Sequence, residues 1–443
     1  MSKQSKTLGL LLLLLPALAC GADLLDAYRD ALAYDSQLAS ARAALEAGQE
    51  RLPQGRAGLL PSLGLSANTA KNESDYESRP SHGVIPTRYN SNGWSVSLSQ
   101  PLFRWQNWAT YKQSELAVAQ AEAQYAAARQ DMLARVTQGY FDVLLAQETL
   151  AAAQSQRTAI AEQLALTKRG FEIGNSSLTD TQEAQARHDL ATAQEIAAAN
   201  DLLIKRRALK IITGKEPQQL KTLKPGVIIS RPQPDDVEQW TRSAEQGSYA
   251  VHSAQAGYEI ADREVGKQRA GHLPTLDLVA TRGRNSQQTQ NVAGVVYPGY
   301  DTNSSTVGLQ LSLPLFTGGS VNSRDREAVA LRDKARADLD NAKHQAALQA
   351  LQAYLGVTSG LAQVQALEQG LVFSRSALAS NRLNYEVGMR ANIDVLNAQQ
   401  QVYSTLRDLT KARFDTLAAQ VRLKAAAGTL GDEDIAALNA LLE

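Results

Sequence analysis

The sequence predicts an α+β membrane protein built as an internal tandem repeat. Three observations lead to this prediction. Segments of the first half recur 213 or 214 residues later, two long stretches contain no proline, and short segments beside the prolines alternate apolar with polar residues. Proline is the strongest helix breaker, so its absence favours long helices, whereas alternation with period two favours strands.

Residues 1–22 are predicted to be a secretory signal peptide. They contain two lysines, an apolar run at 8–15 and a small-residue cleavage pattern just before Cys20. The run is too short to cross a bilayer, and no later segment approaches about eighteen consecutive apolar residues, so no transmembrane helix is expected. Cys20 is the only cysteine, which excludes an internal disulfide and leaves open whether it is lipidated or removed with the signal peptide.

The repeat assigns residues 23–230 to a first unit and 231–443 to a second, each expected to hold a helix, two strands and a long helical hairpin. Five anchors at one nearly constant offset are hard to obtain by chance. The anchors are AGLLPSLGL at 57–65 with AGHLPTLDL at 270–278, VSLSQPLF at 96–103 with LQLSLPLF at 309–316, GYFDVL at 139–144 with AYLGVT at 353–358, FEIGNSSLTD at 171–180 with YEVGMRANID at 385–394, and Gly214 with Gly428.

The predicted strands each have one apolar and one polar face; in the second, Trp94, Val96 and Leu98 alternate with serines. A half-buried soluble sheet would show the same pattern. Export, a strand length near ten residues and long polar loops favour an outer-membrane barrel. Four strands cannot close a barrel, and an open edge in lipid is costly, so the barrel is expected to be shared between subunits. The strands are placed near 59–70, 92–102, 273–283 and 305–315, and the loops at about 70–92 and 283–304.

Long helical hairpins are expected at 104–214 and 317–430. A helix over 107–168 alone would be about 90 Å long. Apolar residues recur every seven positions, as at Val357, Val364 and Leu371, which predicts coiled-coil pairing. Periodicity does not separate a solid bundle from a helical wall around a channel, because rows of Gln, Glu, Arg and Ser could line such a wall.

The quoted motifs, with the closing AAGTLGDEDIAALNALL, resemble the TolC family of outer-membrane channel-tunnels of Gram-negative bacteria over almost the whole chain after the signal peptide. The resemblance implies a homotrimer whose twelve-stranded barrel lies in outer-membrane lipid and continues into the periplasm as an α-helical coiled-coil barrel. It implies a passive exit duct for tripartite efflux and type I secretion, carrying small toxic compounds, proteins or both. The implied partners are a periplasmic membrane-fusion adaptor and an inner-membrane RND, MFS or ABC transporter.

Composition and motifs argue against other classes of function. Lys plus Arg and Asp plus Glu are both 45, so no basic field for nucleic acid is present. The five histidines are scattered without a metal-ligand spacing, and Leu209 stands where a phosphate-binding loop needs glycine, so neither catalysis, cofactor nor metal is expected. The remaining alternative is a periplasmic coiled-coil adaptor or structural protein, which would have one hairpin and no duplicated amphipathic strands.

Both hairpin turns contain a glycine followed six residues later by a carboxylate. Ser177 lies three residues before Asp180, which predicts a capping box, whereas Ala391 takes that place before Asp394 and makes capping a weaker explanation there. The turns are expected to contact the adaptor, because they lie at the exposed periplasmic end. Their residues are Gly174, Asn175, Ser176, Gly388 and Met389.

The resemblance also implies roles for side chains beside the second turn. Asp394 matches an aspartate of the periplasmic constriction, and the family's second acidic ring falls at Asn397, so a less negative gate with weaker divalent-cation block is expected. Tyr385 and Arg390 match residues that latch the inner coiled coil to partners at Thr179 and Asp180. A solvated Arg–Asp pair that contributes little is the alternative.

Overall fold

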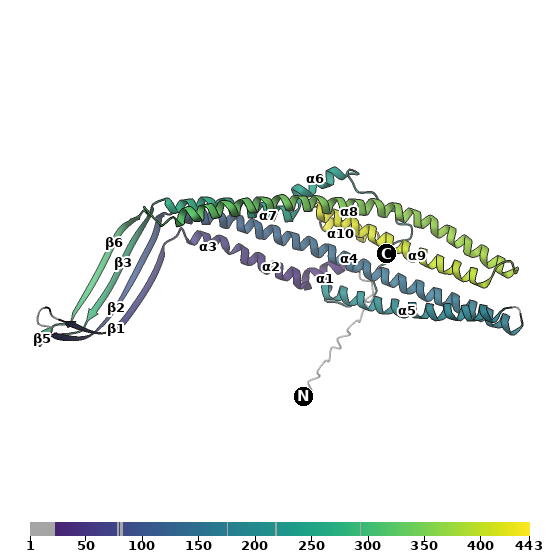
Figure 1. Ribbon diagram of the computed structural model, residues 1–443, viewed down its shortest axis with the longest axis horizontal. Helices are drawn as coiled ribbons and strands as arrows, with labels where there is room; N and C mark the ends of the chain where they lie inside the picture. The colour runs from purple at the N-terminus through teal and green to yellow at the C-terminus, as the bar shows by residue number, and fades with distance from the viewer. Residues whose placement is uncertain (1–22, 78, 80–82, 175, 218, 293) are drawn as a thin grey trace, which may run out of the picture.

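Four strands form one antiparallel sheet at one end of an elongated molecule, and long helices run from it to the other end (Figure 1). The structure is a computed structural model and describes residues 23–77, 79, 83–174, 176–217, 219–292 and 294–443. The signal peptide predicted at 1–22 lies outside the described residues.

The order of elements occurs twice, which confirms the tandem repeat. In both halves, two or three short helices precede a strand pair and a long helical hairpin. The first half contains α1 (Leu24–Tyr34), α2 (Ser36–Gln49), α3 (Arg51–Ala57), β1 (Ser62–Glu77), β2 (Val84–Phe103), α4 (Trp105–Glu172) and α5 (Leu178–Thr213). The second contains α6 (Val237–Gly247), α7 (Tyr249–Arg269), η1 (Ala270–His272), β3 (Thr275–Gln287), β4 (Gln290–Val292), β5 (Val295–Tyr297), β6 (Tyr300–Ser312), α8 (Ser320–Glu386), α9 (Asn392–Ala426) and α10 (Asp432–Asn439).

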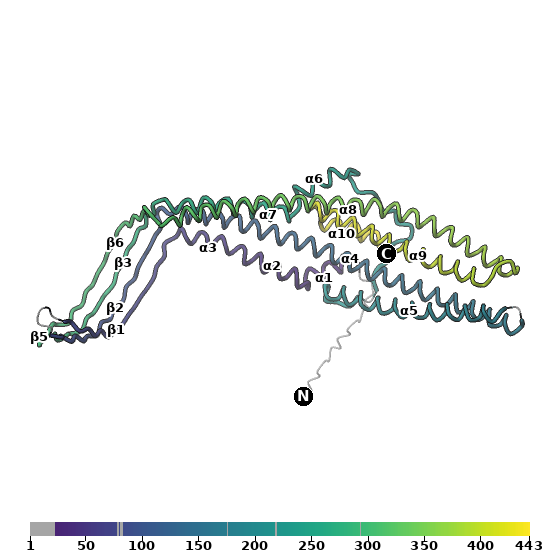
Figure 2. The backbone as a smooth tube through the Cα atoms, viewed as in Figure 1, coloured from purple at the N-terminus to yellow at the C-terminus, as the bar shows by residue number. Residues whose placement is uncertain are grey.

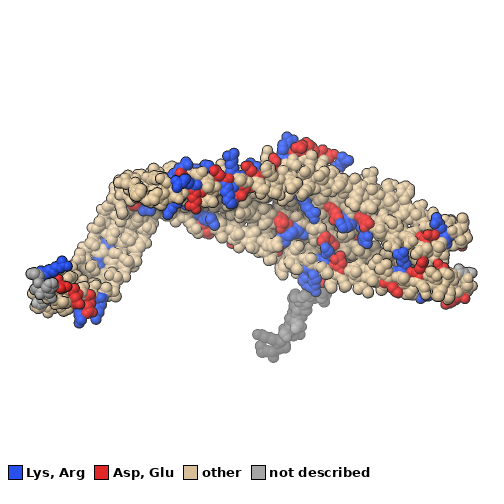
Figure 3. Space-filling view, viewed as in Figure 1, with Lys and Arg blue, Asp and Glu red and all other residues tan. Residues whose placement is uncertain are grey.

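The sheet has strand order β1-β2-β3-β6 and gathers its apolar side chains on one face. Leu65 lies opposite Val96, and Leu278 opposite Leu309, and directly opposed residues of antiparallel strands share a face. Leu65 is 75% exposed and Leu309 66% exposed, so this face is uncovered in the protomer. In Figure 3 the middle of the sheet carries few charged side chains, which gather at its far end. These features fit a sheet that faces lipid.

The strands are longer than predicted, and most of the expected loop residues belong to them. β1 and β2 have 16 and 20 residues, and β3 and β6 have 13 each. Beyond the apolar part the pairing continues through polar side chains, as between Arg88 Nε and Glu73 Oε1 at 2.6 Å. A backbone ladder needs no apolar side chains, so polar composition alone wrongly indicated loops at 70–92 and 283–304.

Two helices, α4 with 68 residues and α8 with 67, run the whole length of the helical part. At about 1.5 Å per residue, each is about 100 Å long. Shorter helices fill the remaining positions. Starting from the sheet, α7 and then α9 lie between α4 and α8, while α3, α2 and then α5 lie along the other side of α4 (Figure 2). The resulting order across the layer at the far end is α5, α4, α9, α8. No helix in the described part of the chain combines the length and apolarity needed to cross a bilayer.

A glycine with positive φ ends the last helix of each hairpin at the same position of the repeat. Gly214 has φ +75°, and a Cβ there would lie 2.6 Å from the ring of Tyr34 at the end of α1. Gly428 has φ +73°, and a Cβ there would overlap the carbonyl oxygen of Gly247 at the end of α6. Both positions therefore need glycine for the left-handed conformation and for the close approach of a second helix end.

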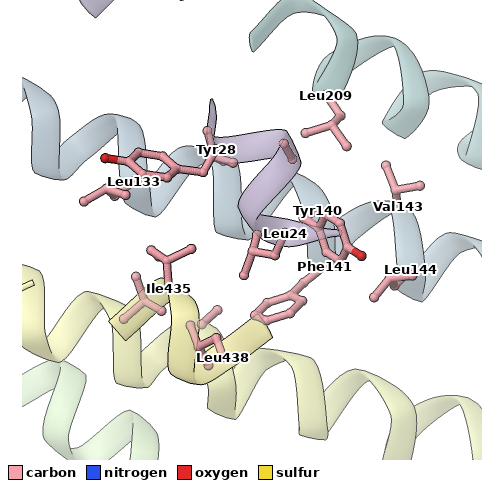
Figure 4. Packing of buried hydrophobic residues seen from close by; sticks show 14 of the residues in the cluster. Leu24, Tyr28, Leu133, Tyr140, Phe141, Val143, Leu144, Leu209, Ile435 and Leu438 are labelled. Atoms are coloured by element: carbon pink, nitrogen blue, oxygen red, sulfur yellow. The ribbon is translucent and has the colours of Figure 1, made fainter. Parts of the chain in front are cut away.

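The largest hydrophobic core lies midway along the helices, where α1, α4, α5, α9 and α10 meet (Figure 4). Tyr140 and Leu24 are fully buried in it. At its edge Asp35 accepts hydrogen bonds from Arg135 Nη1 at 2.8 Å and from two backbone N–H groups at the start of α2. Burial alone raises the pKa of Asp35, but these hydrogen bonds and the Arg135 charge outweigh it and hold the pKa below its usual value.

Candidate gate at the hairpin ends

Both hairpin turns lie at the end of the molecule farthest from the sheet (Figure 1). Gly174 and Gly388 have φ +82° and +76°, which reverses the chain after α4 and α8. Met389 N–H closes the second turn by donating to the carbonyl of Asn384 at 2.8 Å. Among the five predicted contact residues, Asn175 lies outside the described residues.

Apolar side chains are exposed beside both glycines. Ile173 is 72% exposed, Val387 62% and Met389 76%. Of these three side chains, only Met389 was predicted from the sequence to contact a partner. Each turn has an aliphatic residue directly before its glycine, and this pattern could have indicated a contact surface. A helix end that stays in water gains nothing from an exposed aliphatic side chain. Each protomer thus presents two turns with apolar tips.

The predicted capping box at the start of α5 is confirmed. Ser177 Oγ accepts from the N–H of Asp180 at 3.0 Å, and Asp180 Oδ2 accepts from the N–H of Ser177 at 3.0 Å. α9 begins after Ala391 without a side-chain cap, as its sequence indicated. The carboxylate of Asp180 is therefore occupied by its own helix end, and Thr179 beside it is exposed.

Arg390 pairs with Asp394, with 3.5 Å between Nη1 and Oδ2, and both side chains are partly exposed. Within the described residues, no hydrogen bond or ion pair joins Tyr385 or Arg390 to Thr179 or Asp180. The single protomer thus does not bring the four latch residues together, because each charged member has a nearer partner within its own hairpin. The latch stays a prediction for the assembled protein.

A different side chain connects the two hairpins. Arg187 of α5 donates from Nη2 to Asn397 Oδ1 at 2.9 Å and from Nη1 to Gln400 Oε1 at 2.7 Å. Asn397 was predicted to line a constriction, and here its oxygen faces the hairpin of α4 and α5, the outer hairpin. Arg187 was not predicted from the sequence, since an arginine on a polar helix face carries no local signal of a partner more than 200 residues away.

Just beside this contact the two hairpins also meet through buried amides. Gln163 of α4 donates to Asn392 Oδ1 of α9 at 2.6 Å, and Asn392 and Gln399 are 2% and 1% exposed. Neither Asn392 Nδ2 nor Gln399 Oε1 has a hydrogen-bond partner among the described residues. A buried polar atom left without a partner costs about 1–3 kcal/mol, so these amides are sensitive points of the contact between the two hairpins.

The hairpin of α8 and α9, the inner hairpin, has an apolar core of its own. Leu371 of α8 packs against Val402 and Leu409 of α9, with further leucines and valines around them. The contact between the two hairpins thus combines these amides with one apolar anchor, since Leu396 of α9 packs against Ile160 and Leu164 of α4, whereas the core within the hairpin of α8 and α9 is made of leucines and valines. This arrangement is suited to opening and closing rather than to catalysis. Within the described residues, no group of three or more His, Cys, Asp or Glu side chains is placed to hold a metal ion.

Comparisons with known proteins agree with this architecture. Residues 27–215 and 240–429 both match the family described as outer membrane efflux protein. The chain is 34% identical over 432 residues to the alkaline protease secretion protein AprF of Pseudomonas aeruginosa, covering 96% of this chain and 89% of that protein. It is 31% identical over 425 residues to the outer membrane protein TolC of Vibrio cholerae, covering 95% and 94%. The CmeC outer membrane channel of Campylobacter jejuni shares the fold, with a TM-score of 0.79 at 18% identity over 96% of this chain and 90% of that one.

Proposed function

This chain belongs to the outer membrane efflux protein family, and from that membership we propose a trimeric duct whose periplasmic end is opened by partner proteins. The chain is an outer-membrane channel of the efflux and type I secretion class that extends into the periplasm, which confirms the family, function and location predicted from the sequence. Its place in this family also makes it a transport protein and not an enzyme.

The main support for the trimer is that the sheet and the helical layer of the protomer both end in uncovered edges. In the described sheet β1 and β6 each pair on one side only, and they run in opposite directions. The β6 strand of one copy can therefore add to the β1 strand of the next in antiparallel fashion, and three copies give the twelve strands of a closed barrel. Closure removes the unpaired edges that lipid does not tolerate.

The helical layer supports the same ring. Its outer members, α5 and α8, expose apolar side chains at seven-residue spacing, including Ile204 and Ile211 on α5 and Leu348 and Leu355 on α8. Heptad spacing on an uncovered face favours pairing with another helix, here α8 of a neighbouring copy. The layer then encloses a duct of twelve helices.

The gate is proposed at the hairpin ends. Three copies of Asp394 form a ring of carboxylates that binds cations, while Asn397 leaves the next ring neutral. Opening separates the inner hairpin (α8 and α9) from the outer hairpin (α4 and α5) along the contact that contains the buried amides. Arg187 with Asn397 and Gln400 holds the closed state within each protomer, and Tyr385 and Arg390 add a latch to Thr179 and Asp180 in the trimer.

We assign the opening signal to a periplasmic membrane-fusion adaptor that contacts the two turns of each protomer. The residues Gly174, Asn175, Ser176, Gly388 and Met389 form these turns, and the exposed Ile173 and Val387 add apolar area that a partner helix hairpin can cover. An inner-membrane RND, MFS or ABC transporter supplies energy and cargo. The names of the relatives, an alkaline protease secretion protein and an outer membrane efflux family, favour proteins and small toxic compounds as cargo.

The trimer and its conductance are tested together. The purified protein should have the mass of three chains in detergent and form channels in a planar bilayer. Ile204→Glu, which places a charge on the α5 edge, should yield monomers without conductance. Ile228→Glu, in the exposed segment between α5 and α6, should leave the trimer intact. A conducting monomer, or an Ile204→Glu variant that remains fully trimeric, would contradict the proposed assembly.

A further inference from the structure

Two arginines lie on the apolar face of the sheet. Arg282 of β3 is directly opposite Val96 of β2 and Ser305 of β6. Two residues on, Arg284 is directly opposite Trp94 and Asn303. Since opposed residues of antiparallel strands share a face, both guanidinium groups start from the side of the sheet that also carries Leu278 and Ala280. The opposite face carries mostly small and polar side chains, such as Ser97, Thr281 and Gly308.

The position of these arginines along the strand places them at the outward boundary of the apolar band. On this face of β3 the order is Leu276, Leu278, Ala280, Arg282 and Arg284. At about 3.4 Å per residue, this stretch is about 27 Å long, close to the height of about 25 Å that such a band has in outer-membrane barrels. The helices lie at the Leu276 end (Figure 1), so the arginines lie at the end that faces the outer leaflet.

Trp94 shares the row of Arg284 and is 45% exposed. Tryptophan is enriched at the boundary between hydrocarbon and headgroups, where its ring is partly apolar and its N–H can reach polar groups. The position of Trp94 is therefore independent support for placing the lipid headgroups at the level of Arg284. Arg282 lies one row further into the apolar band, and its long side chain can extend along the sheet to the same level.

The two arginines differ in their partners. Arg284 Nη2 lies 2.6 Å from Asp301 Oδ2 of β6. Arg282 is exposed, its two cross-strand neighbours are neutral, and no ion pair or hydrogen bond engages it in the described part of the chain. A charge on a lipid-facing strand without a protein counter-ion requires one from its surroundings.

We propose that Arg282 binds a phosphate of lipid A, the phosphorylated glycolipid of the outer leaflet, with Arg284 and Trp94 completing the site. Charge complementarity selects the ligand: a guanidinium forms paired hydrogen bonds to phosphate oxygens, and the row lies at the level where the glycolipid carries its phosphates. Trp94 packs beside the sugar and the first methylene groups. Because the site lies on the outside of the sheet and far from the hairpin ends, it is independent of the gate.

The test measures lipid A retained by the full-length detergent-solubilised protein, using native mass spectrometry after addition of defined lipids. Wild-type protein should bind bis-phosphorylated lipid A at least tenfold more tightly than Arg282→Gln. Arg282→Lys should bind with an affinity between the two, because it keeps the charge but not the paired hydrogen bonds. Arg88→Gln is the matched control: Arg88 is also on the sheet, but it pairs with Glu73 beyond the apolar band, and its loss should change nothing.

Three outcomes would overturn the proposal. Arg282→Gln could bind lipid A as tightly as the wild type, dephosphorylated lipid A could bind as tightly as the phosphorylated form, or phosphatidylglycerol could compete as well as lipid A. Inorganic phosphate added alone should not displace the lipid, and displacement by it at equal concentration would show an unspecific anion site instead. Since Arg282→Lys keeps the charge and the strand, it reports on the site even if Arg282→Gln inserts poorly into membranes.

Discussion

Arg187 of α5 holds Asn397 of α9, with 2.9 Å between Nη2 and Oδ1, and so connects the outer hairpin to the inner one. Its second nitrogen reaches Gln400 at 2.7 Å. One cation therefore bridges two neutral amides on the hairpin that moves in the proposed opening. A hydrogen bond to a charged group is stronger than one between neutral groups, yet it lacks the long range of an ion pair. In the proposed gate, the closed state is thus held by a short-range contact.

Arg187→Ala is expected to favour the open state. Loss of this partly exposed contact should cost about 1 kcal/mol, which is about fivefold in the ratio of open to closed channels. Single-channel recording in planar bilayers measures this ratio. Lys168→Ala is the matched control, because Lys168 Nζ bonds Gln185 within the outer hairpin at 3.1 Å and its loss removes the same charge. Equal effects of the two variants would show that only the charge, and not the connection, matters.

Asn397→Asp is expected to have the opposite effect. A carboxylate facing Arg187 turns the contact into an ion pair, which should lower the open fraction at low salt and less so at high salt, since ions screen exposed pairs. Conductance recorded between about 0.05 and about 1 M KCl follows this dependence. In the Arg187→Ala background the same substitution should have no closing effect, and closure in that background would place the partner of the introduced carboxylate elsewhere.

Block of the channel current by divalent cations should depend on Asp394 and on its neighbour Arg390. Asp394→Asn should weaken block by divalent cations about tenfold, because the proposed carboxylate ring is the cation site. Arg390→Ser should strengthen the block, since it removes the guanidinium 3.5 Å from each carboxylate. The double variant Arg390→Ser with Tyr385→Phe should in addition enlarge the open state. Titration of the bilayer current with magnesium separates these effects, and a block unchanged in Asp394→Asn would exclude the ring.

Asp35→Asn tests the ion pair with Arg135 at the edge of the main core. The folded-state pKa of Asp35 lies below the unfolded value of about 3.9, so the ionised carboxylate stabilises the fold above that value, and this contribution is lost as pH falls through the folded pKa. At pH 7 the variant should lose about 1–3 kcal/mol. Below about pH 4 the wild type should lose stability faster than the variant, until both melt alike.

Melting curves by circular dichroism between about pH 2 and pH 7 measure the Asp35 effect. Asp26→Asn serves as its control, because Asp26 forms an exposed pair with Arg29 at 3.5 Å, and such pairs contribute little. A constant difference between Asp35→Asn and wild type across this pH range would contradict the assigned pKa shift.

Two glycines with the same backbone conformation should tolerate alanine differently. Gly388→Ala meets no atom within 4 Å and should cost only the left-handed conformation, about 1–2 kcal/mol. Gly428→Ala has the same φ cost and also overlaps the backbone of Gly247, so roughly 3 kcal/mol or more is expected. Apparent melting temperatures of the two purified variants compare them directly, and equal losses would refute the close packing of the two helix ends.

The sequence was sufficient for the features that follow from period and spacing. Strand faces could be read from the alternation around Val96 and Leu309, and the hairpins from the absence of proline and the heptads around Leu371. Strand lengths were underestimated, because residues such as Glu73 and Arg88 extend the backbone ladder with polar side chains. Side-chain composition indicates whether a segment faces lipid or water, but a β-strand can form in both surroundings.

The gate was less predictable, for two physical reasons. The contact from Arg187 to Asn397 depends on how two hairpins more than 200 residues apart align, and neither residue is unusual on its own helix. The latch at Tyr385 and Arg390 was inferred from resemblance, and in the protomer Arg390 finds the carboxylate one turn away at Asp394. Short-range partners compete with distant ones wherever several charges surround a turn.

α7 and α9 are separate helices that lie end to end between α4 and α8, so one can tilt without the other. α9 begins at Asn392 and enters the main core at Phe414, so residues 392–413 form a stretch about 33 Å long ahead of that core. A tilt of about 5° at Phe414 displaces the far end of this stretch by about 3 Å. α7, which continues toward the sheet, need not follow, because no covalent turn joins it to α9. The periplasmic end can therefore dilate by ångströms while the part in the membrane stays mechanically isolated from the movement.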